Sequence, residues 1–115
     1  MYEFWIDDVL VGHSKLERGD APMGVAFGQF ISTDKFEDYK SKAEILDDDS
    51  RRWQGLSVKT PEGQELECHT GIAIIEYGPS DAVFAIEATC LGIDWLLYEE
   101  LFPHHVKAYE DQFED

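Results

Sequence analysis

Residues 82–102, AVFAIEATCLGIDWLLYEELF, decide the fold class, because the spacing of the apolar residues changes within this stretch. Between residues 82 and 91 the apolar residues occur at every second position, and the intervening positions are also mostly apolar. This pattern is typical of a strand buried at the centre of a sheet. From residue 93 the apolar spacing becomes helical. A central strand followed directly by a helix indicates a protein that mixes α and β structure.

The sequence after this stretch predicts more helix, and the sequence before it predicts mainly strands. Pro103 ends or restarts the helix over 93–102, and a second short helix is expected over 104–113. A further helix is expected from Thr33 or Asp34, either of which can cap it, to the acidic run at 47–49. Between residues 13 and 22 the chain is polar and predicts a loop. Strands are predicted over residues 2–6, 9–12, 23–32, 55–60 and 64–77.

Three turns separate these strands: Asp7-Asp8, Pro61-Glu62-Gly63 and residues 78–81. Strands joined by short turns favour antiparallel neighbours. The sequence therefore predicts a single α+β domain over residues 1–115, with a mainly antiparallel sheet of about five to six strands. Its helices are expected on one face of the sheet, in the order ββ-β-α-βββ-α. Gly24 and Gly28 share one face of a predicted strand, where we expect close packing of a helix.

The charge of the chain is unusually acidic and unevenly distributed. The net charge is −16, and residues 60–115 carry 13 acidic residues but only one base, Lys107. A negative field of this size repels the phosphates of nucleic acids and anionic membrane surfaces, and it attracts a basic protein. The N-terminus has no signal-peptide pattern, and Cys68 and Cys90 are too few for a disulfide scaffold. We therefore expect a cytoplasmic protein that binds neither nucleic acid nor membrane.

No catalytic, metal or cofactor signature is present. The four histidines, at positions 13, 69, 104 and 105, lack the spacing of a metal site, and neither cysteine has the neighbours of an activated nucleophile. We expect Cys68 and Cys90 to pack as small apolar groups, and His104 and His105 to form a surface pair beside a helix. The loop from His13 to Asp20, with Glu17 and Arg18, is the first place to look for a site, since loops often carry function.

Aromatic residues ringed by acids form the other candidate site. We expect the predicted C-terminal helices to present Trp95 and Tyr98 as anchors for a partner. The complete predicted contact set is Asp94, Trp95, Tyr98, Glu99, Glu100, Glu110 and Asp111.

The leading hypothesis is a small acidic binding module that docks on a basic protein. Inhibitors and immunity-type proteins that neutralise basic enzymes use the same charge strategy. One alternative is a small enzyme in which the His13–Asp20 loop acts with His69 or with His104 and His105 as acid and base. Another is a self-associating structural protein, which would need an apolar surface patch. The sequence does not indicate an oligomeric state.

Overall fold

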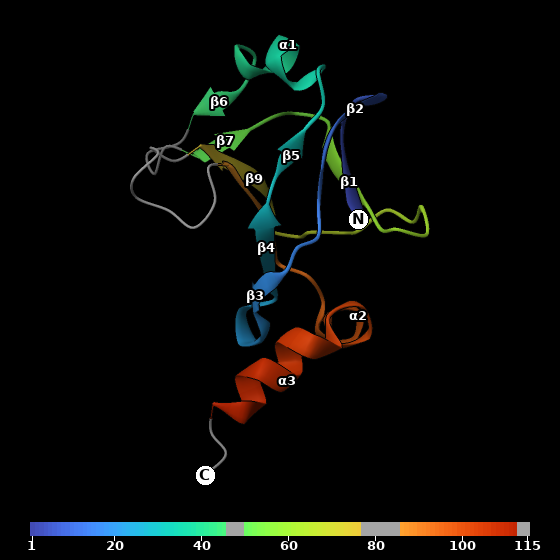
Figure 1. Ribbon diagram of the computed structural model, residues 1–115, viewed down its shortest axis with the longest axis vertical. Coiled ribbons are helices and arrows are strands. Elements are labelled where there is room, and N and C mark those ends of the chain that lie inside the picture. Colours follow the sequence, from blue (N-terminus) through green and yellow to red (C-terminus); the bar gives the residue numbers. More distant parts are fainter. Residues whose placement is uncertain (46–49, 77–85, 113–115) are drawn as a thin grey trace.

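The computed structural model describes residues 1–45, 50–76 and 86–112. Within these residues the chain forms two antiparallel β-sheets and three α-helices (Figure 1). The mixed α and β composition and the antiparallel pairing predicted from the sequence are confirmed. The strands form two sheets, however, where one was expected.

The smaller sheet has four strands in the order β5-β2-β1-β8. The N-terminal hairpin is at its centre, and Ile6 pairs with Val9 across the predicted Asp7-Asp8 turn. The hairpin contains a β-bulge, because Phe4 pairs with Gly12 but Trp5 pairs with Leu10. The strands are β1 (Tyr2–Ile6), β2 (Val9–Ser14), β5 (Ile31–Ser32) and β8 (Leu56–Lys59).

The larger sheet has six strands in the order β3-β4-β10-β9-β7-β6. Its central strand β10 pairs with β4 on one side and with β9 on the other, and Ala88 and Cys90 are fully buried. The predicted central strand is confirmed from residue 86; residues 82–85 and the predicted turn at 78–81 lie outside the described residues. The strands are β3 (Arg18–Asp20), β4 (Val25–Gln29), β6 (Glu44–Ile45), β7 (Ser50–Arg52), β9 (Gly71–Glu76) and β10 (Ile86–Leu91).

The predicted strand over 23–32 divides at Phe30, and this division creates the two sheets. Its first part, β4, pairs with β10, whereas its second part, β5, pairs with β2 of the other sheet. The Phe30 ring is buried edge-on between Phe4 and Phe36, with centroid distances of 5.5 and 5.0 Å. A Cβ atom at Gly12 would collide with this ring, so a glycine in β2 leaves the space that Phe30 occupies. One aromatic side chain thus directs the chain from one sheet to the other.

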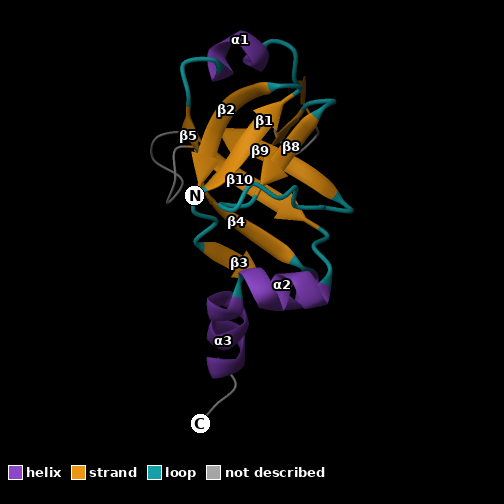
Figure 2. Ribbon diagram, turned by 90° about the vertical axis from the view of Figure 1, so that its right-hand side faces the viewer, coloured by secondary structure: helices purple, strands orange, loops and turns teal. Residues whose placement is uncertain are grey.

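The hydrophobic core lies between the two sheets. Buried residues of the smaller sheet, such as Phe4 and Val58, belong to one cluster with Ile74 and Ala88 of the larger sheet. Figure 2 shows the strands β1, β2 and β8 overlying β9 and β10, in agreement with this layered arrangement. Each sheet therefore covers the apolar face of the other.

The helices lie at opposite ends of the molecule, so the predicted packing on one face of a sheet is not confirmed. Helix α1 (Phe36–Lys40) is at one end, and α2 (Trp95–Leu101) and α3 (Pro103–Asp111) are at the other (Figures 1 and 2). Pro103 occupies the first turn of α3, where proline is tolerated. None of the helices in the described ranges is both long and apolar enough to cross a membrane.

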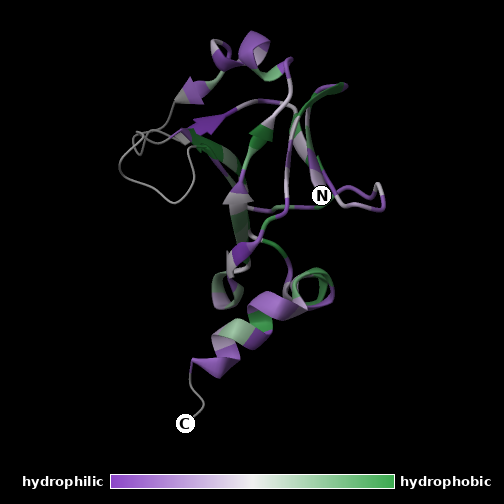
Figure 3. Ribbon diagram, viewed as in Figure 1, coloured by the Kyte–Doolittle hydropathy of each residue, from purple (hydrophilic) through white to green (hydrophobic). Residues whose placement is uncertain are grey.

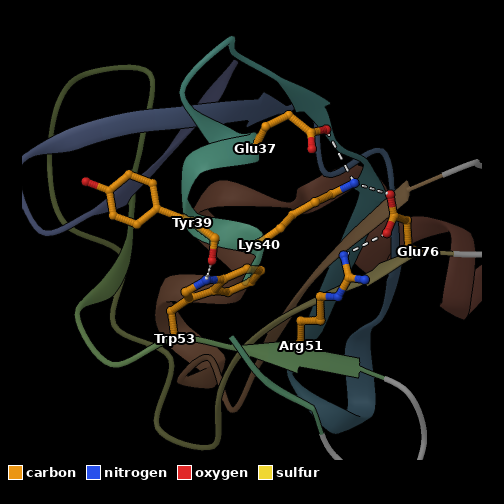
Figure 4. A network of polar contacts seen from close by, with 6 residues as sticks. All are labelled: Glu37, Tyr39, Lys40, Arg51, Trp53 and Glu76. Carbon is orange, nitrogen blue, oxygen red and sulfur yellow. Dashed lines mark hydrogen bonds and ion pairs between the residues drawn. The ribbon is translucent and has the colours of Figure 1, made fainter. Parts of the chain in front are cut away.

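Helix α1 is much shorter than predicted, because the following residues join the larger sheet as β6. The indole N–H of Trp53 donates to the Tyr39 carbonyl at 2.6 Å, in addition to the hydrogen bond that this carbonyl accepts from the Lys42 N–H (Figure 4). Lys40 and Arg51 each contact a different oxygen of Glu76, both at 2.7 Å. This network attaches the helix to β7 and β9.

Other strand boundaries also differ from the predictions: β2 extends to Ser14, and β7 forms where no strand was predicted. The predicted loop over 13–22 contains the edge strand β3 and part of a 3₁₀-helix, η1 (Ala21–Met23). The predicted strand over 64–77 is reduced to β9, and the residues before it form a loop with a single bridge between Lys59 and Glu65. The turn at 61–63 is confirmed by a hydrogen bond from the Gly63 N–H to the Thr60 carbonyl, 2.8 Å long.

Candidate functional site

Helix α2 is held on the larger sheet by Tyr98. This side chain is fully buried, and its hydroxyl donates a 2.8 Å hydrogen bond to the Val25 carbonyl. Gly19 of β3 lacks the Cβ atom that would collide with the hydroxyl. Burial, together with the charge of Asp20, raises the pKa of Tyr98 to about 12. The prediction that Tyr98 contacts a partner is therefore wrong, since the side chain anchors the helix internally.

The outer side of α2 presents apolar side chains among acids. Trp95 is 48% exposed and Leu96 is 81% exposed, whereas Leu97 and Leu101 pack against the core. Figure 3 shows hydrophobic and hydrophilic stretches side by side in α2. We define the α2 surface as Asp94, Trp95, Leu96, Glu99 and Glu100, whose three acidic side chains are all exposed.

The 3₁₀-helix η1 adjoins the beginning of this helix. The Ile93 N–H donates to the Gly24 carbonyl at 2.9 Å, and a Cβ atom at Gly24 would lie 2.6 Å from the Ile93 carbonyl oxygen. Met23, the residue before Gly24, is 69% exposed and adds an apolar side chain to this end of the molecule. The close approach expected at Gly24 is made by backbone, and at Gly28 it is made by the Glu17 carboxylate. Neither glycine faces a helix, so the predicted close packing of a helix against them is wrong.

His69 lies at the beginning of α2. Its Nε2 atom is 3.3 Å from a carboxylate oxygen of Asp94, and its Nδ1 atom is 3.8 Å from Glu67. Glu67 and His69 lie two residues apart in the loop that precedes β9. The contact with Asp94 joins residues far apart in the sequence. Across the described parts of the chain, no three His, Cys, Asp or Glu side chains gather as a metal site would require.

The remaining predicted contact residues, Glu110 and Asp111, are not part of this surface. Both are exposed, and both belong to the last turn of α3, at the end that leads away from α2 (Figure 1). Asp111 is 4.0 Å from Lys107, the base that precedes it by one helical turn. Acids of the two helices therefore occupy separate places.

A cavity of about 700 Å³ lies between the edge strand β3 and α3. Glu17, Arg18 and Asp20 of the predicted loop site line this cavity together with His105. His13 does not belong to its lining and lies in β2, opposite Glu3. The structure thus brings three of the four predicted loop residues to one histidine of the C-terminal pair.

His105 is buried, so the prediction of a surface histidine pair holds only for His104. The Nε2–H of His105 donates to the Leu16 carbonyl at 2.8 Å, and its ring stacks on Phe102 with centroids 5.2 Å apart. Burial lowers the pKa of His105, and neighbouring His104 acts in the same direction against the backbone hydrogen bond. The ring is therefore neutral at pH 7, and burial is the main cause.

The aromatic pattern of residues 95–102 could not by itself separate exposed anchors from core residues. Trp95 and Tyr98 stack with centroids 6.5 Å apart, yet only one of the two rings is exposed. A glycine at position 19 was the one sequence signal of a close approach to this helix. The sequence did not indicate that Leu96 is exposed, because a leucine at helical spacing normally faces the core.

Comparison of the chain with models of protein families, with curated proteins and with solved structures finds no match.

Proposed function

We propose that this protein is a binding module that docks on a basic protein through the α2 surface. The observation that carries the proposal is the exposure of Trp95 and Leu96 between Asp94 and the pair Glu99 and Glu100. An exposed Trp beside a Leu supplies the apolar contact area of an interface centre, and the acids around it supply a polar rim.

Charge selects the class of partner. The chain carries a net charge of −16, and the acids of the α2 surface add to this field where the apolar side chains are exposed. A basic protein is attracted to such a surface before contact, whereas a second copy of the same chain is repelled. We therefore favour a basic partner over self-association. Tyr98 could not contribute to a self-association patch, since its side chain is buried.

The test is an affinity purification from the native host with three immobilised proteins. These are the wild type, a Trp95→Ser/Leu96→Ser variant and an Ile31→Ser control. Ile31 is 45% exposed, and it lies in β5 of the other sheet. We expect the wild type and the control to retain the same basic protein at low salt. The partner should be lost from the α2 variant.

Binding to the purified partner then gives the magnitude. Loss of a Trp anchor costs about 2 kcal/mol or more, which corresponds to a roughly 30-fold weaker Kd. A Glu99→Gln/Glu100→Gln variant should mainly slow association and reduce the salt dependence, whereas Glu62→Gln should change neither. Equal affinities of wild type and the Trp95→Ser/Leu96→Ser variant would contradict the proposal. A concentration-dependent dimer in sedimentation that this variant abolishes would instead support self-association.

A second candidate function is small-molecule binding in the cavity between β3 and α3. It is favoured by the meeting of Glu17, Arg18 and Asp20 with His105, as the enzyme hypothesis requires. The lining also contains Phe27, and it combines acidic and basic groups that suit a zwitterionic ligand. The histidine–carboxylate contacts of His69 lie elsewhere. Amino acids as probes should shift the amide NMR signals of β3 and α3; unchanged signals with every probe would contradict this candidate.

A further inference from the structure

The indole ring of Trp95 lies parallel to a buried ring on the outer side of α2. Its plane is within 4° of the plane of the Tyr98 ring, and the two ring centroids are 6.5 Å apart. Tyr98 is fully buried, and its hydroxyl donates to the Val25 carbonyl. Trp95 itself is 48% exposed. A tyrosine fixed in the core thus supports a flat aromatic surface that solvent reaches.

Several other aromatic rings of the chain have a cation of the chain over them. The Lys59 ammonium lies 4.6 Å from the centroid of the Trp5 ring, and two rings of α1 have lysines over them in the same way. Such a cation is attracted by the negative face of the ring. Trp95 belongs to residues 60–115, whose only base, Lys107, makes its ion pair within α3. This half of the chain therefore has no further base to place over Trp95.

Acidic side chains lie before and after Trp95 along the chain. Glu99 follows it by one helical turn, at the spacing that places two side chains on the same side of a helix. Asp94 precedes it directly, and this carboxylate is 73% exposed although His69 is 3.3 Å from it. A cation over the indole would therefore meet a negative field and, in Glu99, a hydrogen-bond acceptor.

The geometry selects the kind of cation. The guanidinium of arginine is planar, stacks on aromatic rings and directs its N–H donors outward in its own plane, where a carboxylate can accept them. A lysine ammonium is a strongly hydrated point charge without a flat face. We propose that the α2 surface binds an arginine side chain of the basic partner, with its guanidinium stacked on Trp95 and hydrogen-bonded to Glu99. The inference rests on the proposed docking function and names the group of the partner that is recognised.

Short peptides test this subsite without the partner. The probes are acetylated tripeptide amides of arginine, of lysine and of citrulline, which resembles arginine but is uncharged. In ¹H–¹⁵N NMR spectra of the full chain at low salt, the indole N–H signal of Trp95 should shift most with the arginine peptide, less with lysine and not with citrulline. The signals of Trp5 and Trp53 should stay in place, because Lys59 covers the first ring and the second is buried with its N–H bonded to Tyr39.

Substitutions separate the two contacts. Trp95→Leu keeps an apolar side chain but removes the aromatic face, so it should weaken binding of the arginine peptide by about two- to five-fold, measured from the amide signals of α2. Glu99→Gln should weaken it by about two-fold. Glu100→Gln is the matched control, because it removes the same charge from another side of the helix, and its effect should be smaller.

Three results would overturn the inference. One is a Trp95 signal that does not respond to the arginine peptide, and another is a response of equal size to lysine or citrulline. Both are measured on the wild type, so they do not depend on the folding of a variant. The third is equal affinity of the wild type and Trp95→Leu for the arginine peptide.

The purified partner separates a failure of this inference from a failure of the docking function. If Trp95→Leu binds the partner as the wild type does, whereas Trp95→Ser/Leu96→Ser does not, docking is supported and the arginine subsite is refuted. If neither variant binds the partner more weakly, the docking function itself is refuted. A loss with both variants, together with the arginine-specific shift of the Trp95 signal, is the result we expect.

Discussion

The contact between Gly19 and Tyr98 predicts a specific coupling between a strand and a helix. In the substitution Gly19→Ala, the new Cβ atom would collide with the Tyr98 hydroxyl and would lie 2.8 Å from the His105 ring and 2.9 Å from the Val25 carbonyl oxygen. Overpacking of this kind costs about 1–3 kcal/mol. Displacing the hydroxyl would also break its hydrogen bond to Val25, for about 1–3 kcal/mol more. We expect Gly19→Ala to lower the free energy of unfolding by about 3 kcal/mol.

Removing the hydroxyl should remove most of this penalty. Tyr98→Phe alone should cost about 1 kcal/mol, because it deletes the hydrogen bond and leaves the ring buried. In the Tyr98→Phe background, Gly19→Ala no longer meets the hydroxyl, and its cost should fall to about 1–2 kcal/mol. The two substitutions should therefore be less destabilising together than the sum of their separate effects, by about 1–2 kcal/mol.

Urea denaturation followed by far-UV circular dichroism measures all four proteins of this cycle. Gly63→Ala is the matched control, because a Cβ atom there meets nothing within 4 Å, although the backbone angle φ is +87°. Its cost, about 1–2 kcal/mol for a left-handed backbone, should be equal in both backgrounds. If Gly19→Ala costs the same with and without the hydroxyl, within about 0.5 kcal/mol, the proposed contact is refuted.

Two predictions concern the dependence of stability on pH. Lys40 is the main cause of the lowered pKa of Glu76, and Arg51 adds to it; this contribution is present above pH 4.5 and is lost as the pH falls through the pKa of the folded state. Because these groups are partly exposed, Glu76→Gln should cost only about 0.5–1 kcal/mol at pH 7, and its difference from the wild type should shrink toward pH 3 in urea denaturation. A constant difference would argue against the ion pairs. The pKa of His105 is also lowered, so this histidine, like Glu76, stabilises the fold at higher pH. The neutral ring contributes its full stability above pH 6.5, and this contribution is lost as the pH falls from 6.5 to the pKa of the folded state. Wild type should thus lose stability relative to His105→Gln between pH 7 and 5, and parallel pH profiles of the two proteins would contradict the buried position of the ring.

The elements with strong local signals could be predicted from the sequence. The hairpin around Asp7-Asp8, the apolar strand that becomes β10 and the restart of helix at Pro103 each depend on residues close together in the chain. Periodicity reports on such elements because it reflects which side of a single segment is buried. The acidity of residues 60–115 is likewise a property of the sequence alone.

Only the tertiary structure decided how these elements combine. The division of residues 23–32 between two sheets depends on the space that Gly12 leaves for Phe30. The burial of Tyr98 depends on the space that Gly19 leaves for its hydroxyl. Each of these contacts joins residues distant in sequence, and local spacing cannot specify which of several apolar positions will find a partner. Trp95 and Leu96 remain at the surface because Tyr98 is the side chain of this part of α2 that is buried in the core.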